Sequence, residues 1–313
     1  MAGVLVPLSV LGALTGCSSD GAETTPDCRV SSTDRTAGPL VWSDDFDGHE
    51  VDRRRWTVRD RDKLSFDQAA IRADNATVRD GLLRLTARRE SAGGRRYTTA
   101  YLDTIGRFSR QYGRWEIRAR LPVAPGRSTG LWPAFWLRGD RTAGEVDVLE
   151  AWGTPVTTGR RLGGSAAWAV HEDTNRGPGA RSVSGWAGPA RLDRDFHTFA
   201  VDRTPHCLRF SVDGRTTGVV AVDDHAWTRP ALDGPLNMRL NLQVGGAYWG
   251  RVSRTTTRLP AVFEVDRVRV YALHPRARDT SRALGPRPVV MNHPAATLNR
   301  RDTQPAGRGT EAR

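Results

Sequence analysis

Short runs in which apolar and polar residues alternate fill the chain from Leu40 to Leu273, and no long amphipathic helical pattern interrupts them. Gly, Pro, Asp and Asn separate these runs, as is typical of strands joined by turns. Two Asp-Gly pairs, within Arg79–Leu82 and Val212–Arg215, are signals of tight antiparallel hairpins. The pattern predicts an all-β domain over 40–273, and its length suits one sandwich with a single core.

One of these runs, Gly144–Gly153, alternates acids with valines, so that Glu145 and Asp147 share one face of a strand. A helix is the poorer interpretation because valine is a weak helix former. Glu150 lies an odd number of residues from Glu145 and would face the opposite side of a regular strand. A β-bulge near Val148–Leu149 would absorb one residue and bring Glu150 onto the acidic face.

Three carboxyls on one strand face repel one another, which raises the pKa of at least one of them. Protonated and ionised forms can then coexist near neutral pH. A retaining glycosidase needs that pair of states, because one carboxylate attacks the sugar while one carboxylic acid protonates the leaving oxygen. The alternative from spacing alone is a solvated strand face that carries acids without chemistry.

Two tryptophans precede the acidic strand in Leu131–Leu137, and Trp132 and Trp136 fall on one strand face. An indole offers a sugar a broad apolar surface and one N–H donor. Core packing is the alternative for either residue alone. Their common face beside the acids favours a carbohydrate site.

With these motifs in place, the chain resembles glycoside hydrolase family 16, in its laminarinase-like form. The resemblance rests on Leu131–Leu137 followed by Gly144–Glu150, and on further stretches in family order: Leu40–Gly48, Asp74–Leu85, Tyr112–Glu116, Phe196–Phe199, Val212–Gly214, Leu240–Gly246 and Val265–Tyr271. It implies a concanavalin-A-like jelly-roll β-sandwich with a substrate cleft across the concave sheet. It also implies that Glu145 is the nucleophile, Glu150 the general acid/base, and Asp147 the residue that tunes the nucleophile.

The resemblance extends to side chains that would line the cleft. Besides Trp132 and Trp136, these substrate-binding candidates are Asn75, Tyr101, His171, Gln243 and Trp249. Amide, imidazole and phenol groups suit sugar hydroxyls, and tyrosine also stacks. A turn residue is the alternative for Asn75, and a loop histidine is the alternative for His171. Laminarinase-like members commonly have arginine where this chain has Tyr101.

A structural calcium ion on the convex face is a further expectation from the resemblance. Its ligands would be Asp45, the backbone of Gly81, and Asp266. Hard oxygen ligands of this kind suit Ca²⁺. Solvated surface acids are the alternative, and no cofactor is expected for catalysis itself.

The two ends of the chain differ from the central segment. Residues 1–17 hold a short apolar run that ends at Cys17, which resembles a bacterial lipoprotein signal with Cys17 as the lipidated residue. Residues 18–39 are polar and predict a flexible tether, and residues 274–313, rich in Pro and Arg, predict a disordered basic tail. The protein is therefore expected outside the cytoplasm, lipid-anchored or secreted, where Cys28 and Cys207 could form a disulfide.

The formal net charge of +12 raises nucleic acid as a partner. Outside the basic tail the arginines are dispersed, Lys63 is the only lysine, and no nucleic-acid-binding motif is present, so this partner is not expected. The leading hypothesis is a monomeric, retaining endo-β-glycosidase acting on a β-1,3- or mixed-linkage glucan. A galactan or acidic exopolysaccharide, a transglycosylase with the same residues, and a lectin-like binding protein are the alternatives.

Overall fold

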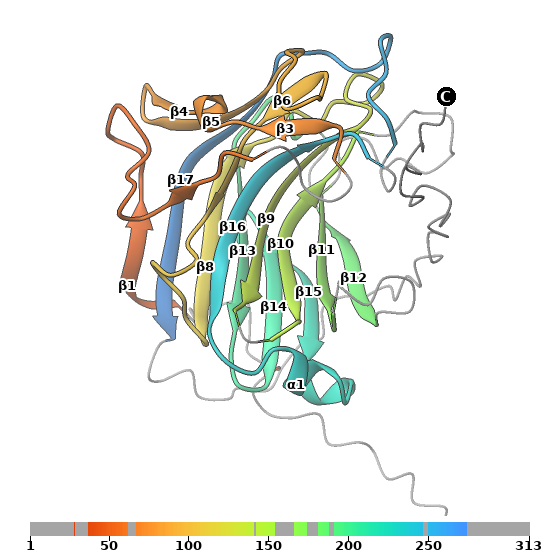
Figure 1. Ribbon diagram of the computed structural model, residues 1–313. Coiled ribbons are helices and arrows are strands. Elements are labelled where there is room, and N and C mark those ends of the chain that lie inside the picture. The colour runs from red at the N-terminus through yellow and green to blue at the C-terminus, as the bar shows by residue number, and fades with distance from the viewer. Residues whose placement is uncertain are drawn as a thin grey trace, which may run out of the picture.

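The computed structural model describes residues 28, 37–61, 67–140, 142–153, 166–173, 181–187, 191–246 and 250–273. Two antiparallel sheets lie face to face and build a β-sandwich, which confirms the predicted all-β class (Figure 1). The single turn of α1 (Thr228–Ala231) lies at the opposite end of the molecule from β3 and β6 (Figure 1). No described helix has the length and apolar character needed to cross a membrane.

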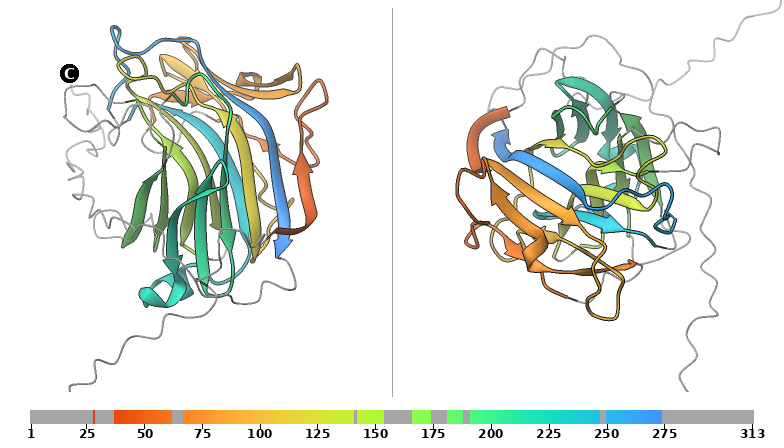
Figure 2. Two further views of the ribbon diagram at one scale, coloured as in Figure 1. Left: turned by 180° about the vertical axis from the view of Figure 1, so that it is seen from behind. Right: turned by 90° about the horizontal axis from the view of Figure 1, so that it is seen from above.

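The first sheet has eight strands in the order β15-β14-β13-β8-β17-β5-β4, with β1 also paired to β17. Its strands are β1 (Ala37–Asp44), β4 (Ala76–Arg79), β5 (Leu82–Ala87), β8 (Gly113–Arg120), β13 (His197–Arg203), β14 (Cys207–Val212), β15 (Arg215–Ala221) and β17 (Ala261–Leu273). We call it the outer sheet; it lies in front when the molecule is seen from behind (Figure 2).

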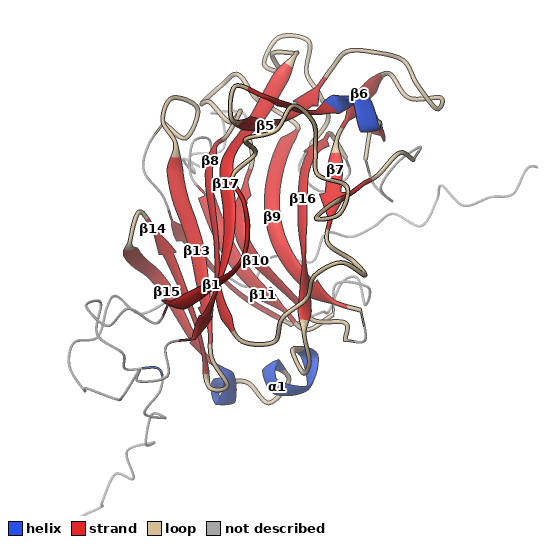
Figure 3. Cartoon of the chain, turned by 90° about the vertical axis from the view of Figure 1, so that its left-hand side faces the viewer, coloured by secondary structure: helices blue, strands red, loops and turns tan. Residues whose placement is uncertain are grey.

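The second sheet has seven strands in the order β12-β11-β10-β9-β16-β7-β2. Its strands are β2 (Thr57–Val58), β7 (Tyr101–Asp103), β9 (Leu131–Gly139), β10 (Glu145–Ala151), β11 (Ala166–His171), β12 (Ser182–Ala187) and β16 (Leu236–Val244). We call it the cleft sheet, and its strands curve along their length (Figures 1 and 3). A small parallel pair, β3 (Ala69–Ile71) and β6 (Tyr97–Thr99), and two short 3₁₀ helices, η2 (Ala73–Asn75) and η5 (Val222–Asp224), complete the described elements.

The core fills the space between the sheets because each strand presents alternate residues to it. On β8, Trp115, Ile117 and Ala119 are fully buried, whereas the residues between them are only partly buried. Apolar side chains of β9, β10 and β16 meet them from the cleft sheet and form one contiguous cluster. The polar residues that alternate with these apolar ones in β9, β10 and β16 are therefore left on the other face of the cleft sheet.

A stacked aromatic pair ties the two sheets together near β11 and β14. The rings of Trp168 and Phe210 lie 4.5 Å apart at an interplanar angle of 11°. Gly185 and Gly218 make room for the indole, because a Cβ on either glycine would lie within 2.5 Å of its ring atoms. Deleting such a buried ring typically costs about 3–5 kcal/mol, so this pair fixes the distance between the sheets.

Both predicted Asp-Gly hairpins are present. Asp80 and Gly81 join β4 to β5, and Asp213 and Gly214 join β14 to β15. All four residues have positive φ, as a type I′ turn requires at both central positions.

A disulfide joins Cys28 to Cys207, the first residue of β14, with 5.3 Å between their Cα atoms. The bridge that the sequence left open is therefore formed. It attaches Cys28 to the outer sheet. Residues 1–27 and 274–313, which include Cys17, lie outside the described residues, so their predicted roles stay predictions.

Candidate active site

The acidic face of β10 depends on a bulge. Against β11, the register shifts between Asp147 and Glu150, and against β9 it shifts between Asp147 and Leu149. The shift turns Glu150 toward the face that carries Glu145 and Asp147, while Val148 and Leu149 both join the core. The bulge predicted from strand parity is confirmed.

Register across the cleft sheet places these acids in rows with polar side chains of neighbouring strands. Glu145 lies between Arg138 of β9 and His171 of β11. Asp147 lies beside Trp136, which in turn lies beside Arg239 of β16. The floor of the cleft is thus assembled from three consecutive strands, β9, β10 and β11, and from β16, which lies much later in the sequence.

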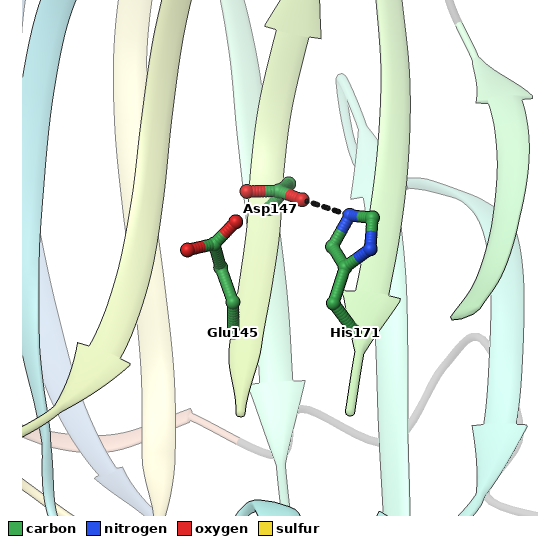
Figure 4. A group of neighbouring side chains, drawn as sticks. All are labelled: Glu145, Asp147 and His171. Carbon is green, nitrogen blue, oxygen red and sulfur yellow. Dashed lines mark ion pairs between the residues drawn. The ribbon is translucent and has the colours of Figure 1, made fainter. Parts of the chain in front are cut away.

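His171 forms an ion pair with Asp147. Its Nε2 lies 2.9 Å from Oδ2 of Asp147, and both side chains point to the same region as Glu145 (Figure 4). One oxygen of Glu145, one oxygen of Asp147 and one ring nitrogen of His171 all lie within 4.8 Å of one another. The histidine therefore orients the middle carboxylate, and it ends a strand instead of lying in a loop.

The two outer acids have different partners. Nη1 of Arg138 lies 3.4 Å from Oε2 of Glu145, which favours the ionised form of that carboxyl. The indole Nε1 of Trp132 donates a hydrogen bond of 2.9 Å to Oε1 of Glu150. Because this oxygen accepts the indole hydrogen, a proton on Glu150 resides on the other oxygen, Oε2.

Burial dominates the titration of all three acids. Burial, together with the neighbouring charge of Asp147, raises the pKa of Glu145 to about 7, against the lowering effects of His171, Arg138 and Arg239. Burial likewise raises the pKa of Asp147 and of Glu150, with the charge of Asp147 also raising that of Glu150. Raised pKa values allow a protonated and an ionised carboxyl to coexist in the site, as an acid and a nucleophile side by side require.

Trp136 offers a sugar less free ring surface than the sequence suggested. Its Nε1 donates to Oδ1 of Asn241 at 2.8 Å, and the guanidinium carbon of Arg239 lies 4.8 Å from the ring centroid. One face of this indole is therefore covered by a cation. The ring of Trp132, whose Nε1 donates to Glu150, has its centroid 6.4 Å from that of Trp152.

The remaining substrate-binding candidates have different surroundings. Tyr101 lies opposite Asn241, and burial raises the pKa of its hydroxyl to about 12, so the phenol stays neutral. Gln243 lies opposite Trp132, and its buried Nε2 has no hydrogen-bond partner in the described part of the chain. Trp249 lies outside the described residues.

Asn75 was expected to bind substrate, but its side-chain nitrogen is engaged inside the protein. The side chain is only 1% exposed, and its Nδ2 donates to the carbonyl of Thr86 at 2.7 Å and to Oγ1 of Thr98 at 2.9 Å. Both amide hydrogens are used inside the protein. The nitrogen is therefore unavailable to sugar hydroxyls, and the amide instead joins η2 to the neighbouring strands.

Two of the expected calcium ligands, Asp45 and Asp266, form ion pairs. Oδ1 of Asp45 lies 2.7 Å from Arg269, and Oδ2 of Asp266 lies 2.7 Å from Arg267 and 3.2 Å from Arg118. In each carboxylate one oxygen therefore contacts a guanidinium group. The local charge is already balanced, so these acids are explained by ion pairs.

Sequence reasoning missed Arg138, Arg239 and Asn241 as residues of the cleft floor. A signal was present: in β16, Asn237, Arg239, Asn241 and Gln243 alternate with core residues. The same parity places Arg138 on the face of Trp136.

The geometry supports displacement at a sugar carbon. Glu145 can attack, Glu150 can donate a proton from Oε2, and Asp147 with His171 sets the charge between them. A lectin needs no such set of carboxyls with raised pKa values, so binding alone does not account for the site.

Comparisons with known proteins agree with this chemistry. The model of the family described as Glycosyl hydrolases family 16 matches residues 65–259. The chain is 34% identical over 283 residues to the "Beta-glucanase" of Rhodothermus marinus, covering 84% of this chain and 92% of that protein. It is 27% identical to the "Glucan endo-1,3-beta-glucosidase A1" of Niallia circulans, of which it spans 37%. The X-ray structure of the laminarinase from Rhodothermus marinus superposes with a TM-score of 0.65 at 32% identity, covering 75% of this chain and 97% of that one.

Proposed function

The chain belongs to glycosyl hydrolases family 16, and from this premise we propose that it is a retaining endo-β-glucanase whose substrate is a β-1,3-linked or mixed-linkage glucan. The observation that carries the proposal is the bulge in β10, which places Glu145, Asp147 and Glu150 on one face of the cleft sheet. The substrate class is supported by the beta-glucanase that is 34% identical over most of this chain.

In the first step, the carboxylate of Glu145 attacks the anomeric carbon while Glu150 protonates the glycosidic oxygen, which leaves with the bonding electron pair. Trp132 keeps Oε1 of Glu150 engaged, so the proton is presented from Oε2. In the second step, Glu150 takes a proton from water, and the resulting hydroxide displaces Glu145 from the sugar. Two inversions give the β-configuration again.

Asp147 acts on Glu145 through charge. An ionised Asp147 raises the pKa of Glu145, so Glu145 loses its proton more readily when Asp147 is protonated or paired with protonated His171. The contact with His171 thus helps to keep the nucleophile ionised before the first step.

The test is product analysis with laminarin. Proton NMR of the first product should show the β-anomer before mutarotation, and chromatography at low conversion should show oligosaccharides of several lengths. An α-anomer at first detection would contradict retention. Glucose as the sole early product would contradict endo action.

The disulfide between Cys28 and Cys207 supports a location outside the cytoplasm, where such bridges persist. Lipid attachment at Cys17 would hold the enzyme at the cell surface, with residues 18–27, which precede the bridged Cys28, as its tether. A monomer suffices for this function, because every catalytic side chain comes from one chain.

A further inference from the structure

One charged group on the cleft floor has no role in the steps above. Arg239 is only 8% exposed, and its Nη1 is buried with no hydrogen-bond partner among the described residues. The side chain lies over Trp136, in register between that residue and Asp103 of β7. A buried arginine without an acid partner is unusual, since such cations are normally paired.

The neighbouring acids are already engaged by other groups. Asp103 forms two hydrogen bonds with Arg59, one of them 2.8 Å long between Nη2 and Oδ1. Glu145 is paired with Arg138. No salt bridge in the described part of the chain therefore neutralises Arg239.

Arg138 adds to the cost of burying Arg239. It lies two residues from Trp136 on β9, on the same face of the sheet, and its charge lowers the pKa of Arg239. Two guanidinium groups so placed repel each other. The ring of Trp136 offsets part of the cost of burying Arg239 through a cation–π contact, but it supplies no acceptor for Nη1.

The missing partner must therefore bring both an acceptor and negative charge. Hydroxyl groups of a neutral sugar would satisfy the N–H groups of Arg239 but would bring no negative charge to its guanidinium. A carboxylate or sulfate ester supplies acceptor oxygens and charge together, and its planar or tetrahedral oxygens match the fork of a guanidinium.

We propose that Arg239, with Arg138 beside it, forms a subsite for an anionic substituent, a carboxylate or a sulfate, on the polysaccharide next to the cleaved bond. This inference rests on the proposed hydrolase function. Arg239 lies two strands from β10, which is about 10 Å at the usual strand spacing. The substituent is therefore carried by a sugar beside the reacting one, so Arg239 is a specificity residue and not a catalytic one.

The first test compares three derivatives of laminarin at matched substitution: carboxymethylated, sulfated, and hydroxyethylated as a neutral control of similar bulk. The measured quantity is the kcat/KM ratio of each anionic derivative to the hydroxyethylated one. Arg239→Gln should lower this ratio at least about 10-fold, and Arg239→Lys, which keeps the charge, should retain most of it. If Arg239→Gln lowers the ratio for only one anionic derivative, the subsite binds that anion. If it lowers both ratios, the subsite accepts a carboxylate or a sulfate.

The matched control is Arg79→Gln, which removes the same charge at an exposed position on β4. It should leave the ratio unchanged. Because the ratio compares two substrates of one preparation, loss of folded protein cancels. An equal ratio in wild type and Arg239→Gln overturns the subsite, and so does an equal loss of activity on all three substrates.

A second measurement needs no variant. Mass spectrometry of the fragments that the wild-type enzyme releases from partly carboxymethylated laminarin should find the substituent enriched at one fixed distance from the new end. A random distribution overturns the proposal. If the wild type cleaves no laminarin at all, neutral or substituted, the hydrolase function itself fails, which is a separate outcome.

Discussion

The outer face of the outer sheet and the floor of the cleft are both rich in charge, but their charges are arranged differently. On the outer face, Asp202 pairs with Arg114, Glu264 with Arg120 and Arg84, and Asp266 with Arg118. In the cleft, three carboxyls crowd one strand, while a buried arginine two strands away has no carboxylate partner among the residues that the structure describes.

The difference shows what each face contributes. Neutralised pairs on a partly exposed surface are worth little individually and keep the sheet soluble. Unmatched charges in a buried cleft lower the stability of the fold. They are retained because they interact with charge on the substrate and in the transition state. Changes in the cleft should therefore alter chemistry, whereas changes on the outer face should alter stability slightly.

The largest effect is expected from Glu145→Ala. Without the nucleophile no glycosyl-enzyme forms, so hydrolysis of laminarin should fall by roughly four orders of magnitude. Azide added with an activated β-glycosyl donor should enter the vacated space and give the α-glycosyl azide. NMR of the azide product is the measurement.

The companion variant Glu150→Ala separates the two roles. It keeps the nucleophile, so an aryl glycoside with a good leaving group should still react, and azide should give the β-glycosyl product. The same azide anomer from both variants would contradict the assignment of Glu145 and Glu150.

A smaller effect is expected from Arg138→Gln. Arg138 lowers the pKa of Glu145, whereas burial has raised it to about 7. Removing the cation should raise that pKa further, so the acid limb of kcat/KM should move to higher pH, by about one unit. Because Glu145 must be ionised to attack, activity should be lost mainly below neutral pH.

The pH profile of kcat/KM for both proteins measures this shift. Arg79→Gln again serves as the control for a general change in charge. An acid limb that stays in place would mean that Arg138 does not act on the nucleophile.

The smallest effect belongs to the outer face. Since Asp45 and Asp266 are already neutralised by arginines, excess chelator should leave the melting temperature unchanged. Asp266→Asn should lower the free energy of unfolding by less than about 1 kcal/mol, because the pair is partly exposed. A clear drop in melting temperature with chelator would restore the calcium hypothesis.

Much of the fold was readable from local pattern. Alternation identified the strands, and the Asp-Gly pairs located two hairpins because their positive φ angles are a property of those residues. The bulge followed from counting alone, since Glu150 stands an odd number of residues from Glu145. These features depend on near neighbours in sequence.

The partners of the charged groups were not readable in this way. Asp45, which directly follows β1, pairs with Arg269 of β17. The side-chain amide of Asn75 donates hydrogen bonds to residues of β5 and β6. Such contacts depend on which strands lie side by side.

The sequence by itself determined that this chain is a β-sandwich with three acids on one strand face, because strand period and turn chemistry act over a few residues. Only the tertiary structure decided that, within the described part of the chain, Arg239 forms no salt bridge while Arg138 pairs with Glu145 and His171 pairs with Asp147. The reason is physical: a charge is matched by whatever the sheet register brings within a few ångströms, and register is set by the packing of the whole sandwich.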